Sequence, residues 1–225
     1  KLTQNPDVYQ TIKYRDIATA KRIMPIIKDM ITKMDDPLYA ALKAAVIGNV
    51  LDAAIAGEFD LANDLKKEYE APFVLNDIES LSADLEHARH VLIIGDNAGE
   101  TVFDTILLEA LHDKQLTYAV RENNILNDAT IKEAKDSDID RYATLISSGC
   151  SCPGTVLSEC SQTFLDTFYA ADVVIAKGQG NYEGLHGCDR KVYFLLKAKC
   201  IVLAKMLDVP MGSYVITCKT TCDRS

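Results

Sequence analysis

The sequence lacks any apolar run long enough for a membrane-spanning helix, and it shows no internal repeat and no low-complexity tract. A membrane helix needs about 20 consecutive apolar residues. The most apolar stretch, residues 38–56, is interrupted by Lys43, Asn49 and Asp52. No signal peptide is visible either. We therefore expect neither a membrane partner nor a repeat architecture.

Positive charge is scarce, because 24 Lys and Arg stand against 33 Asp and Glu, a formal net charge of −9. A field of that sign repels phosphate backbones, so nucleic acid is not an expected partner. A small anion is not excluded, since a site can be locally positive inside an acidic protein. Over 225 residues, 48% hydrophobic and 25% charged residues predict an ordinary globular protein with a full core.

The sequence also lacks a disulfide framework, although it contains seven cysteines. Cys150 and Cys152 are too close for an ordinary bridge, and the count is odd. Because a chain of this size needs no disulfides to fold, we expect reduced thiols and a cytoplasmic location. Only one of the four histidines, His186, lies near the end of an expected strand. A Cys/His nucleophilic enzyme is therefore open but not favoured.

The hydrophobic pattern changes near residue 90. Before it, apolar residues recur at three- and four-residue steps, which is typical of helices. A capping residue at Asp36 followed by Pro37 predicts one of these helices over residues 38–56. We therefore expect a helical subdomain over residues 1–88 and a separate α/β domain over residues 89–225.

Short buried strands alternate with helices in the second part, which predicts a parallel sheet covered on both faces. The expected strands are residues 91–94, 116–120, 142–147, 172–176, 192–196 and 214–217, and the expected helices are residues 101–111, 130–135, 155–169 and 200–207. Ligands of such sheets bind outside the carboxyl ends of the strands, so we search there for the site.

Two strand ends carry oxygen donors that suit a divalent ion. Asp96 and Asn97 follow the first strand, where either of them could hold a metal ion or cap the next helix. Asp128 follows the second strand. Thr130 and Glu133 already have the spacing of a capping box, which leaves Asp128 free for another role. A shared site for one Mg²⁺ or Mn²⁺ is the favoured interpretation.

Two later strand ends carry features that suit an anion. The turn from Gly149 through Gly154 to Thr155 is rich in small residues, and a following helix would aim N–H groups at an anion. An ordinary tight turn explains that segment at least as well. Lys177 ends a buried strand and needs a negatively charged partner, either a phosphoryl group or the carboxylates of the metal site. Gly178 beside it permits close approach of the backbone to a ligand.

Inside the expected buried helix, Asn49 and Asp52 are three residues apart and share a face. They either reach into the site or bond to the neighbouring backbone, and the sequence leaves both readings open.

Three motifs together resemble the damage-control phosphatase family, which is also called acidic-residue methyltransferase-like. They are Gly-Asp-Asn-Ala-Gly-Glu at 95–100, Asn-Asp-Ala-Thr at 127–130 and Lys-Gly-Gln-Gly-Asn-Tyr-Glu at 177–183, and the similarity extends to residues 193–200 and loosely to 36–37 and 48–52. The resemblance implies a helical N-terminal part and a Rossmann-like three-layer α/β/α sandwich with a mostly parallel sheet.

The resemblance also implies a divalent ion (Mn, Mg, Co or Ni) held by Asp96, Asn97 and Asp128, with Lys177 binding the phosphate of a small phosphorylated metabolite. Relatives act on sugar phosphates or on damaged or surplus phosphometabolites. The expected catalytic residues are Asp96, Asp128 and Lys177, and the further candidates for substrate contact are Gly178, Gly149, Gly154, Asn49, Asn181 and Glu100. A departure lies at residues 121–124, Arg-Glu-Asn-Asn, where the family often has small residues.

The expected function is metal-dependent hydrolysis of a phosphate monoester, with water or a carboxylate attacking in line. One alternative is an S-adenosylmethionine-dependent methyltransferase, for which Glu122 is the only obvious ribose-binding acid. Another alternative is a non-catalytic regulator that binds a metal ion or metabolite. The sequence carries no indication of oligomeric state.

Overall fold

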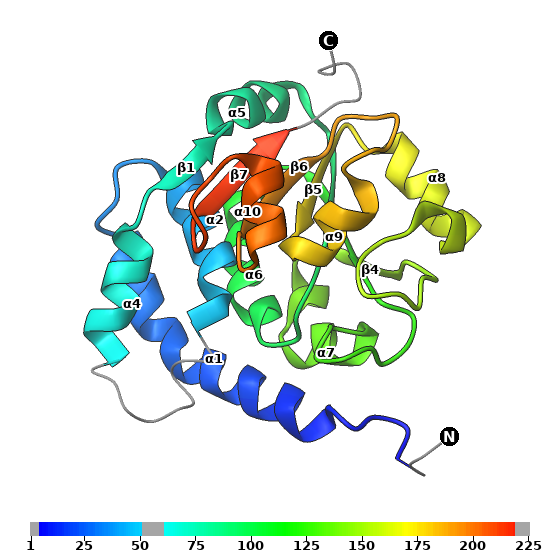
Figure 1. Ribbon diagram of the computed structural model, residues 1–225, viewed down its shortest axis with the longest axis horizontal. Coiled ribbons are helices and arrows are strands. Elements are labelled where there is room, and N and C mark those ends of the chain that lie inside the picture. The colour runs from blue at the N-terminus through cyan, green and yellow to red at the C-terminus, as the bar shows by residue number, and fades with distance from the viewer. Residues whose placement is uncertain (1–4, 51–60, 219–225) are drawn as a thin grey trace.

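The computed structural model of the chain describes residues 5–50 and 61–218, and the side chains of residues 49, 50 and 61–64 lie outside the described part. Within these residues, seven strands form one sheet in the order β1-β7-β6-β5-β2-β3-β4 (Figure 1). The strands are β1 Phe73–Asn76, β2 His90–Ile94, β3 Gln115–Val120, β4 Thr144–Ser147, β5 Val173–Lys177, β6 Tyr193–Lys197 and β7 Tyr214–Cys218. All neighbouring strands are parallel except the pair β6 and β7, which is antiparallel.

Helices cover both faces of the sheet (Figure 1). They are α1 Gln10–Ile31, α2 Pro37–Val46, α4 Leu61–Glu70, α5 Ile78–His87, α6 Glu100–Ala110, α7 Ile131–Asp136, α8 Gln162–Ala170, α9 Gly178–Leu185 and α10 Ile201–Leu207, with the short 3-10 helices η1 Ile47–Val50, η2 Ile139–Arg141 and η3 Leu157–Glu159. No helix among these described segments is long and apolar enough to cross a membrane.

Residues of β2 alternate between two hydrophobic clusters, as the period of two in a strand requires. Val91 and Ile93 pack into the cluster that also holds apolar residues of α1, α2, α5 and α6. Leu92 and Ile94 pack into the cluster of α8, α9 and α10 on the opposite face. The sheet is therefore the middle layer of an α/β/α sandwich, and the expected fold class is confirmed.

The N-terminal part, residues 1–88, is not purely helical, because it contributes one strand to the sheet. β1 pairs with β7 at the edge of the sheet. α1 and α2 share the first hydrophobic cluster with the sheet instead of forming a core of their own. The contrast in hydrophobic period near residue 90 marks a change of element type, and packing nonetheless joins both parts in one core.

Two helix starts that the sequence predicted are confirmed. Asp36 caps α2, because its Oδ1 accepts a hydrogen bond from the Tyr39 N–H at 3.0 Å. The capping box of α7 is present, with the Thr130 N–H donating to Glu133 Oε2 at 2.9 Å. The predicted helix ends agree less well with the structure. α2 passes into η1 after Val46, and residues 51–56 of the expected helix lie outside the described part.

The expected helix over residues 155–169 is wrong over its first seven residues. Residues 155–161 form a loop with the single turn η3, and α8 begins at Gln162, where the Ser161 hydroxyl caps it by accepting from the Phe164 N–H. Conversely, residues 178–185, which were not predicted as a helix, form α9. A Cβ atom at Gly184 would lie 2.2 Å from the Thr155 carbonyl oxygen. The glycines therefore let α9 pack directly against the backbone of that loop.

Candidate active site at the carboxyl ends of the strands

The loops after β2 and β3 hold the candidate metal ligands next to each other. Asn97 and Asp128 form an antiparallel bridge, and the Ala129 N–H donates to the Asp96 carbonyl at 2.8 Å. These backbone bonds fix the spacing of residues that are 31 positions apart in the sequence, 128 minus 97. The structure therefore brings together the three side chains that the motifs singled out.

A cavity of about 190 Å³ opens at this edge of the sheet. Its lining combines the three oxygen donors with residues that follow β4, β5 and β6. The lining residues are Asp96, Asn97, Leu126, Asn127, Asp128, Pro153, Gly154, Gly178, Gln179, Gly180, Lys197 and Lys199. Its position agrees with the general rule for ligands of open α/β sheets.

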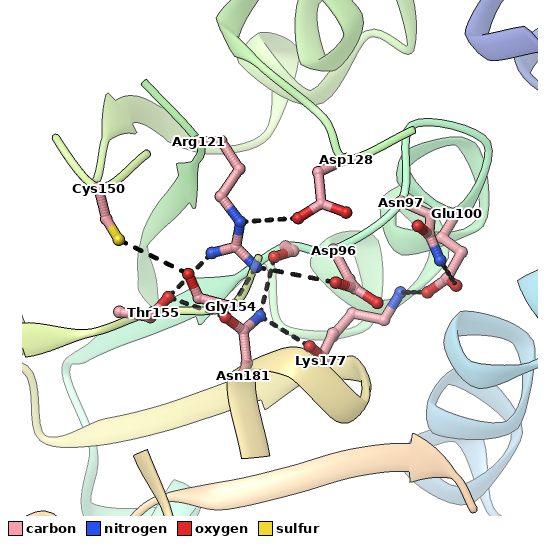
Figure 2. A network of polar contacts seen from close by, with 11 residues as sticks. Asp96, Asn97, Glu100, Arg121, Asp128, Cys150, Gly154, Thr155, Lys177 and Asn181 are labelled. Carbon is pink, nitrogen blue, oxygen red and sulfur yellow. Dashed lines mark hydrogen bonds and ion pairs between the residues drawn. The ribbon is translucent and has the colours of Figure 1, made fainter. Parts of the chain in front are cut away.

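Arg121, which follows β3 directly, lies beneath the acidic wall of the cavity and is almost fully buried. Its Nε donates to Asp128 Oδ2 at 2.8 Å, and its other two nitrogens donate to Thr155 Oγ1 at 2.9 Å and Asn181 Oδ1 at 3.0 Å (Figure 2). One of these nitrogens also lies 3.8 Å from Asp96 Oδ1. A single guanidinium group thus connects four of the strand-end segments.

Asn181 completes this arrangement from α9. Its amide nitrogen donates to the carbonyl oxygens of Gly95, at 3.0 Å, and Lys177, at 2.7 Å. Asn181 is fully buried and does not line the cavity, so the structure places it as a support of the site. Neither Asn181 nor Arg121 offers a free polar atom to a ligand.

Lys177 is also fully buried and does not line the cavity, and its ammonium group points toward Glu100 of α6 (Figure 2). Its Nζ lies 2.9 Å from Glu100 Oε2 and 2.6 Å from Asp104 Oδ1. The Tyr118 hydroxyl donates to the other oxygen of Asp104 at 2.6 Å. Burial by itself would lower the pKa of Lys177, but the Asp104 and Glu100 carboxylates outweigh it and hold the pKa above its usual value.

Glu100 links Lys177 to the candidate metal ligands. Its second oxygen, Oε1, accepts a hydrogen bond from Asn97 Nδ2 at 3.0 Å. Since the amide nitrogen of Asn97 is held in this way, its oxygen Oδ1 is left for the cavity, and it has no hydrogen bond to any other described residue. Glu100 itself is buried and does not line the cavity.

The cations near Asp96 and Asp128 only partly compensate the negative charge of these two carboxylates. Burial raises the pKa of Asp96 to about 8, and the carboxylates of Asp128 and Glu100 add to the effect against Arg121 and Lys177. Burial likewise raises the pKa of Asp128, with Arg121 opposing. Such raised values in a cleft are typical of groups that receive a cation or a proton during function.

The donor set fits a hard divalent ion. Two carboxylates and one amide oxygen line the same cavity, and such ions prefer oxygen ligands and keep several waters. Among the described residues, no group of three or more His, Cys, Asp or Glu side chains could hold a metal ion. An ion bound here would therefore take the Asn97 amide oxygen as its third protein ligand.

Several other expected site residues lie elsewhere. Gly149 adopts φ = +74° and packs against Ser161, so only the end of its loop, Pro153 and Gly154, reaches the cavity. The helix that was expected to follow this loop directly, and to direct its N–H groups at an anion, begins only at Gln162. Asn49 lies in η1 with its side chain outside the described part, and Asp52 lies outside it altogether.

Gly178 does reach the cavity, and its φ of +78° is one that only glycine adopts without strain. A Cβ atom there would lie 1.9 Å from Asp96 Oδ2, so the start of α9 packs directly on that carboxylate. The first N–H groups of a helix have no partner within it, and Gly178, Gln179 and Gly180 present this first turn at the cavity wall. Such a helix start favours a bound anion.

Sequence reasoning missed the roles of Arg121, Asp104, Lys197 and Lys199, and of the Thr155 side chain. Glu100 and Asp104 are four apart in a helix, a spacing that places both on one face and could have indicated a shared cation. Glu122, the ribose-binding acid that a methyltransferase would need, is exposed, accepts from the Ser147 hydroxyl and does not line the cavity.

Comparison with known proteins places the chain in a family. The family model of the damage-control phosphatase ARMT1-like domain matches residues 1–215. The damage-control phosphatase PH1575 of Pyrococcus horikoshii is 36% identical over 220 residues, which cover 96% of this chain and 76% of that protein. A damage-control phosphatase of Archaeoglobus fulgidus is 31% identical over 217 residues, covering 93% of this chain and 75% of that protein.

A solved structure agrees as well. The crystal structure of PH1575, described as a DUF89 family protein, superposes with a TM-score of 0.83 at 34% identity, covering 95% of this chain and 75% of that chain. Sequence and fold thus point the same way over nearly the whole chain. The protein belongs to the damage-control phosphatase ARMT1-like family, and its activity is that of a phosphatase.

Proposed function

We propose that this phosphatase hydrolyses phosphate monoesters of small metabolites and depends on a divalent ion held by Asp96, Asn97 and Asp128. The observation that carries the proposal is the convergence of these three oxygen donors on one cavity, with Asp96 raised in pKa to about 8 by burial and neighbouring carboxylates. A bound ion supplies Lewis-acid polarisation of a phosphoryl oxygen. The remaining steps belong to the side chains of the chain itself.

Asp96 is the better candidate for the base or nucleophile of the two acids. Asp128 holds one oxygen against Arg121 at 2.8 Å, whereas Asp96 has no side-chain hydrogen bond to any described residue. A carboxylate with a raised pKa is suited to accept a proton near neutral pH. Arg121 and Asn181 keep the acidic wall in place during the reaction.

The cavity size supports a small substrate. A volume of about 190 Å³ accommodates a phosphoryl group with few further atoms, so the rest of the metabolite extends toward the opening. The first turn of α9 at Gly178, Gln179 and Gly180 orients the phosphoryl oxygens through its N–H groups. Sugar phosphates and other small phosphometabolites are the substrate class proposed.

The test is phosphate release by the purified protein from a panel of phosphate esters, with Mn²⁺, Mg²⁺, Co²⁺ or Ni²⁺ and with EDTA. We expect ion-dependent turnover and a loss of more than about a hundredfold in Asp96→Asn and Asp128→Asn, beyond what losing an outer-shell partner costs. Asp166→Asn, an exposed aspartate of α8, is the matched control and should behave as wild type.

Full activity in EDTA would overturn the metal dependence. Wild-type turnover in the Asp96 or Asp128 variants would overturn the residue assignment. Absence of turnover with every ester and ion would overturn the proposal for small monoesters as a whole.

A further inference from the structure

One leucine in the cavity lining has no role in the core. Leu126 and Pro153 are the two apolar side chains of the lining, and the other lining residues are polar, charged or glycine. Leu126 lies in the loop after β3, and 50% of its surface is exposed. It belongs to neither of the two hydrophobic clusters that join the helices to the sheet. Burial in the core therefore does not explain an apolar residue at this position.

The backbone of Leu126 has a conformation that leucine rarely adopts. Its φ is +48°, in the left-handed region, where the Cβ atom crowds the following carbonyl oxygen. Among the described residues, the other non-glycine residues with positive φ are Asp138 and Asp208. Aspartate tolerates this region because its short side chain can bond to the local backbone. Leu126 therefore has a conformational cost that packing of its side chain does not offset.

Backbone hydrogen bonds of the candidate metal site hold Leu126 in this conformation. The Asp128 N–H donates to the Ile125 carbonyl oxygen at 3.0 Å, which closes a turn with Leu126 as its second residue. The Asn127 carbonyl oxygen accepts from the Ala98 N–H at 2.8 Å. Positive φ at the second residue of a turn is usually found at glycine, asparagine or aspartate. The turn thus fixes an exposed aliphatic side chain next to Asp128.

The rest of the cavity already accounts for the ion and the phosphoryl group. Asp96, Asn97 and Asp128 supply oxygen donors, and the first turn of α9 supplies N–H groups. Neither task needs an aliphatic side chain. The remaining part of a phosphate monoester is the leaving group beyond the ester oxygen, and an aliphatic side chain can remove its apolar surface from water. Strained residues are typical of functional sites, which agrees with a ligand contact at Leu126.

We propose that Leu126 is a specificity-determining residue that contacts the leaving group of the substrate, together with Pro153 of the loop after β4. The proposal rests on the proposed function and narrows its substrate class. The preferred monoesters present carbon-bound hydrogens close to the ester oxygen, on an alkyl chain or on one face of a ring. Removing about 50 Å² of apolar surface from water corresponds to about tenfold in affinity or in kcat/KM.

The test separates contact with the leaving group from support of the metal site. Leu126→Ala removes the side chain, Leu126→Asn replaces it with a residue that tolerates positive φ, and Leu126→Met keeps an apolar side chain of similar size. Val74→Ala is the matched control, because Val74 of β1 is 49% exposed and does not line the cavity.

Inorganic phosphate, methylphosphonate and n-butylphosphonate are the probes, since they differ in the apolar group attached to phosphorus. Their binding to the Mn²⁺-saturated protein is measured by calorimetric titration, as is the binding of Mn²⁺ alone. The Tm of each variant and its kcat/KM with the best ester of the phosphate panel complete the set of measurements.

We expect wild type to bind n-butylphosphonate about tenfold more tightly than methylphosphonate. Leu126→Ala and Leu126→Asn should lose this preference and about tenfold in kcat/KM, whereas Leu126→Met and Val74→Ala should resemble wild type. Binding of inorganic phosphate and of Mn²⁺ should not change in any variant. The Tm of Leu126→Asn should equal or exceed that of wild type, because asparagine relieves the strain, whereas loss of a packing residue would lower it.

Equal affinity of wild type for the two phosphonates would overturn the proposed substrate class. A preference that persists in Leu126→Ala would overturn the assignment of Leu126. Weaker binding of Mn²⁺ or inorganic phosphate in Leu126→Ala and Leu126→Asn would show that Leu126 acts through Asp128 instead of touching the leaving group. If wild type released no phosphate from any ester, the proposed function would fail, and the binding measurements would still decide the role of Leu126.

Discussion

The floor and the rim of the cavity use cations in opposite ways. We call the buried Arg121 and Lys177, which lie behind the residues that line the cavity, the floor of the site. Each of these cations contacts two carboxylates. The rim consists of Lys197 and Lys199, which line the opening at the end of β6. Rim lysines have one carboxylate partner or, for Lys199, none among the described residues.

The difference shows what burial requires of a charge. A buried cation without a counter-ion is costly, so the floor cations are fully paired and serve to hold side chains in place. An exposed cation is stabilised by water and can exchange that water for a ligand. The number and burial of partners therefore distinguish the buried cations of the floor from the more exposed cations of the rim.

The largest expected effect is on stability, and it contrasts one lysine of the floor with one of the rim. Lys177→Met leaves Glu100 and Asp104 buried without their cation, so the free energy of unfolding should fall by about 3–5 kcal/mol. Lys199→Met removes an exposed side chain and should change it by less than about 0.5 kcal/mol. Urea unfolding followed by circular dichroism measures both.

The loss in free energy of unfolding caused by Lys177→Met, called the deficit below, should also depend on pH. Burial raises the pKa of Asp104 to about 6 from 3.8, so the native state binds this proton more readily than the unfolded state. Protonation of Asp104 therefore favours the native state as the pH falls through this range, and losing Lys177 raises its pKa further. We expect a smaller deficit at pH 5 than at pH 8, and a deficit that stays constant or grows toward pH 5 would contradict this account.

The next effect tests whether the floor needs geometry or only charge. Arg121→Lys keeps one positive charge but cannot reach Asp128, Thr155 and Asn181 together, contacts that now measure 2.8, 2.9 and 3.0 Å. Because Asp128 then loses its fixed orientation, Mn²⁺ affinity should fall by about tenfold to a hundredfold, as for other outer-shell partners. Calorimetric titration measures it.

Arg141→Lys, at an exposed arginine of η2, is the matched control and should bind Mn²⁺ as wild type does. Equal Mn²⁺ affinity in Arg121→Lys and wild type would show that a positive charge alone suffices at this position. The three contacts of Arg121 would then not be needed to orient Asp128.

The smallest expected effect comes from removing the carboxylate partner of Lys197, the paired lysine of the rim. Glu68→Gln removes the carboxylate that lies 2.6 Å from Lys197 Nζ. Since a partly exposed ion pair contributes about 0.2–1 kcal/mol, the inhibition constant of phosphate should fall by up to about fivefold. Steady-state inhibition by inorganic phosphate measures this change.

Tyr214→Phe removes the other hydrogen bond to Glu68 without freeing Lys197, so its phosphate inhibition should match that of wild type. Weaker phosphate inhibition in Glu68→Gln would mean that Glu68 positions Lys197 for the ligand instead of neutralising it.

The sequence was sufficient for features that depend on neighbouring residues along the chain. Continuous apolar runs predicted strands such as β2 and β5, because a strand covered on both faces must be apolar throughout. The caps at Asp36 and Thr130 followed from side chains that reach only two or three residues ahead. The acids Asp96 and Asp128 could be placed at strand ends by the same reasoning.

Tertiary structure decided what depends on elements that meet only after folding. Local pattern does not show that β7 runs antiparallel to β6, since an extended run reads alike in both directions. The direction of Lys177 is a similar case. Lys177 lies two residues after Ile175 in β5, so its side chain is on the same face of the sheet. Only the packing of α6 on that face places Glu100 and Asp104 around it. The sequence by itself thus determined which groups stand at the ends of the strands. The packing of helices on the sheet determined which of them are buried and paired and which remain open to a ligand, because burial is a property of neighbours distant in sequence.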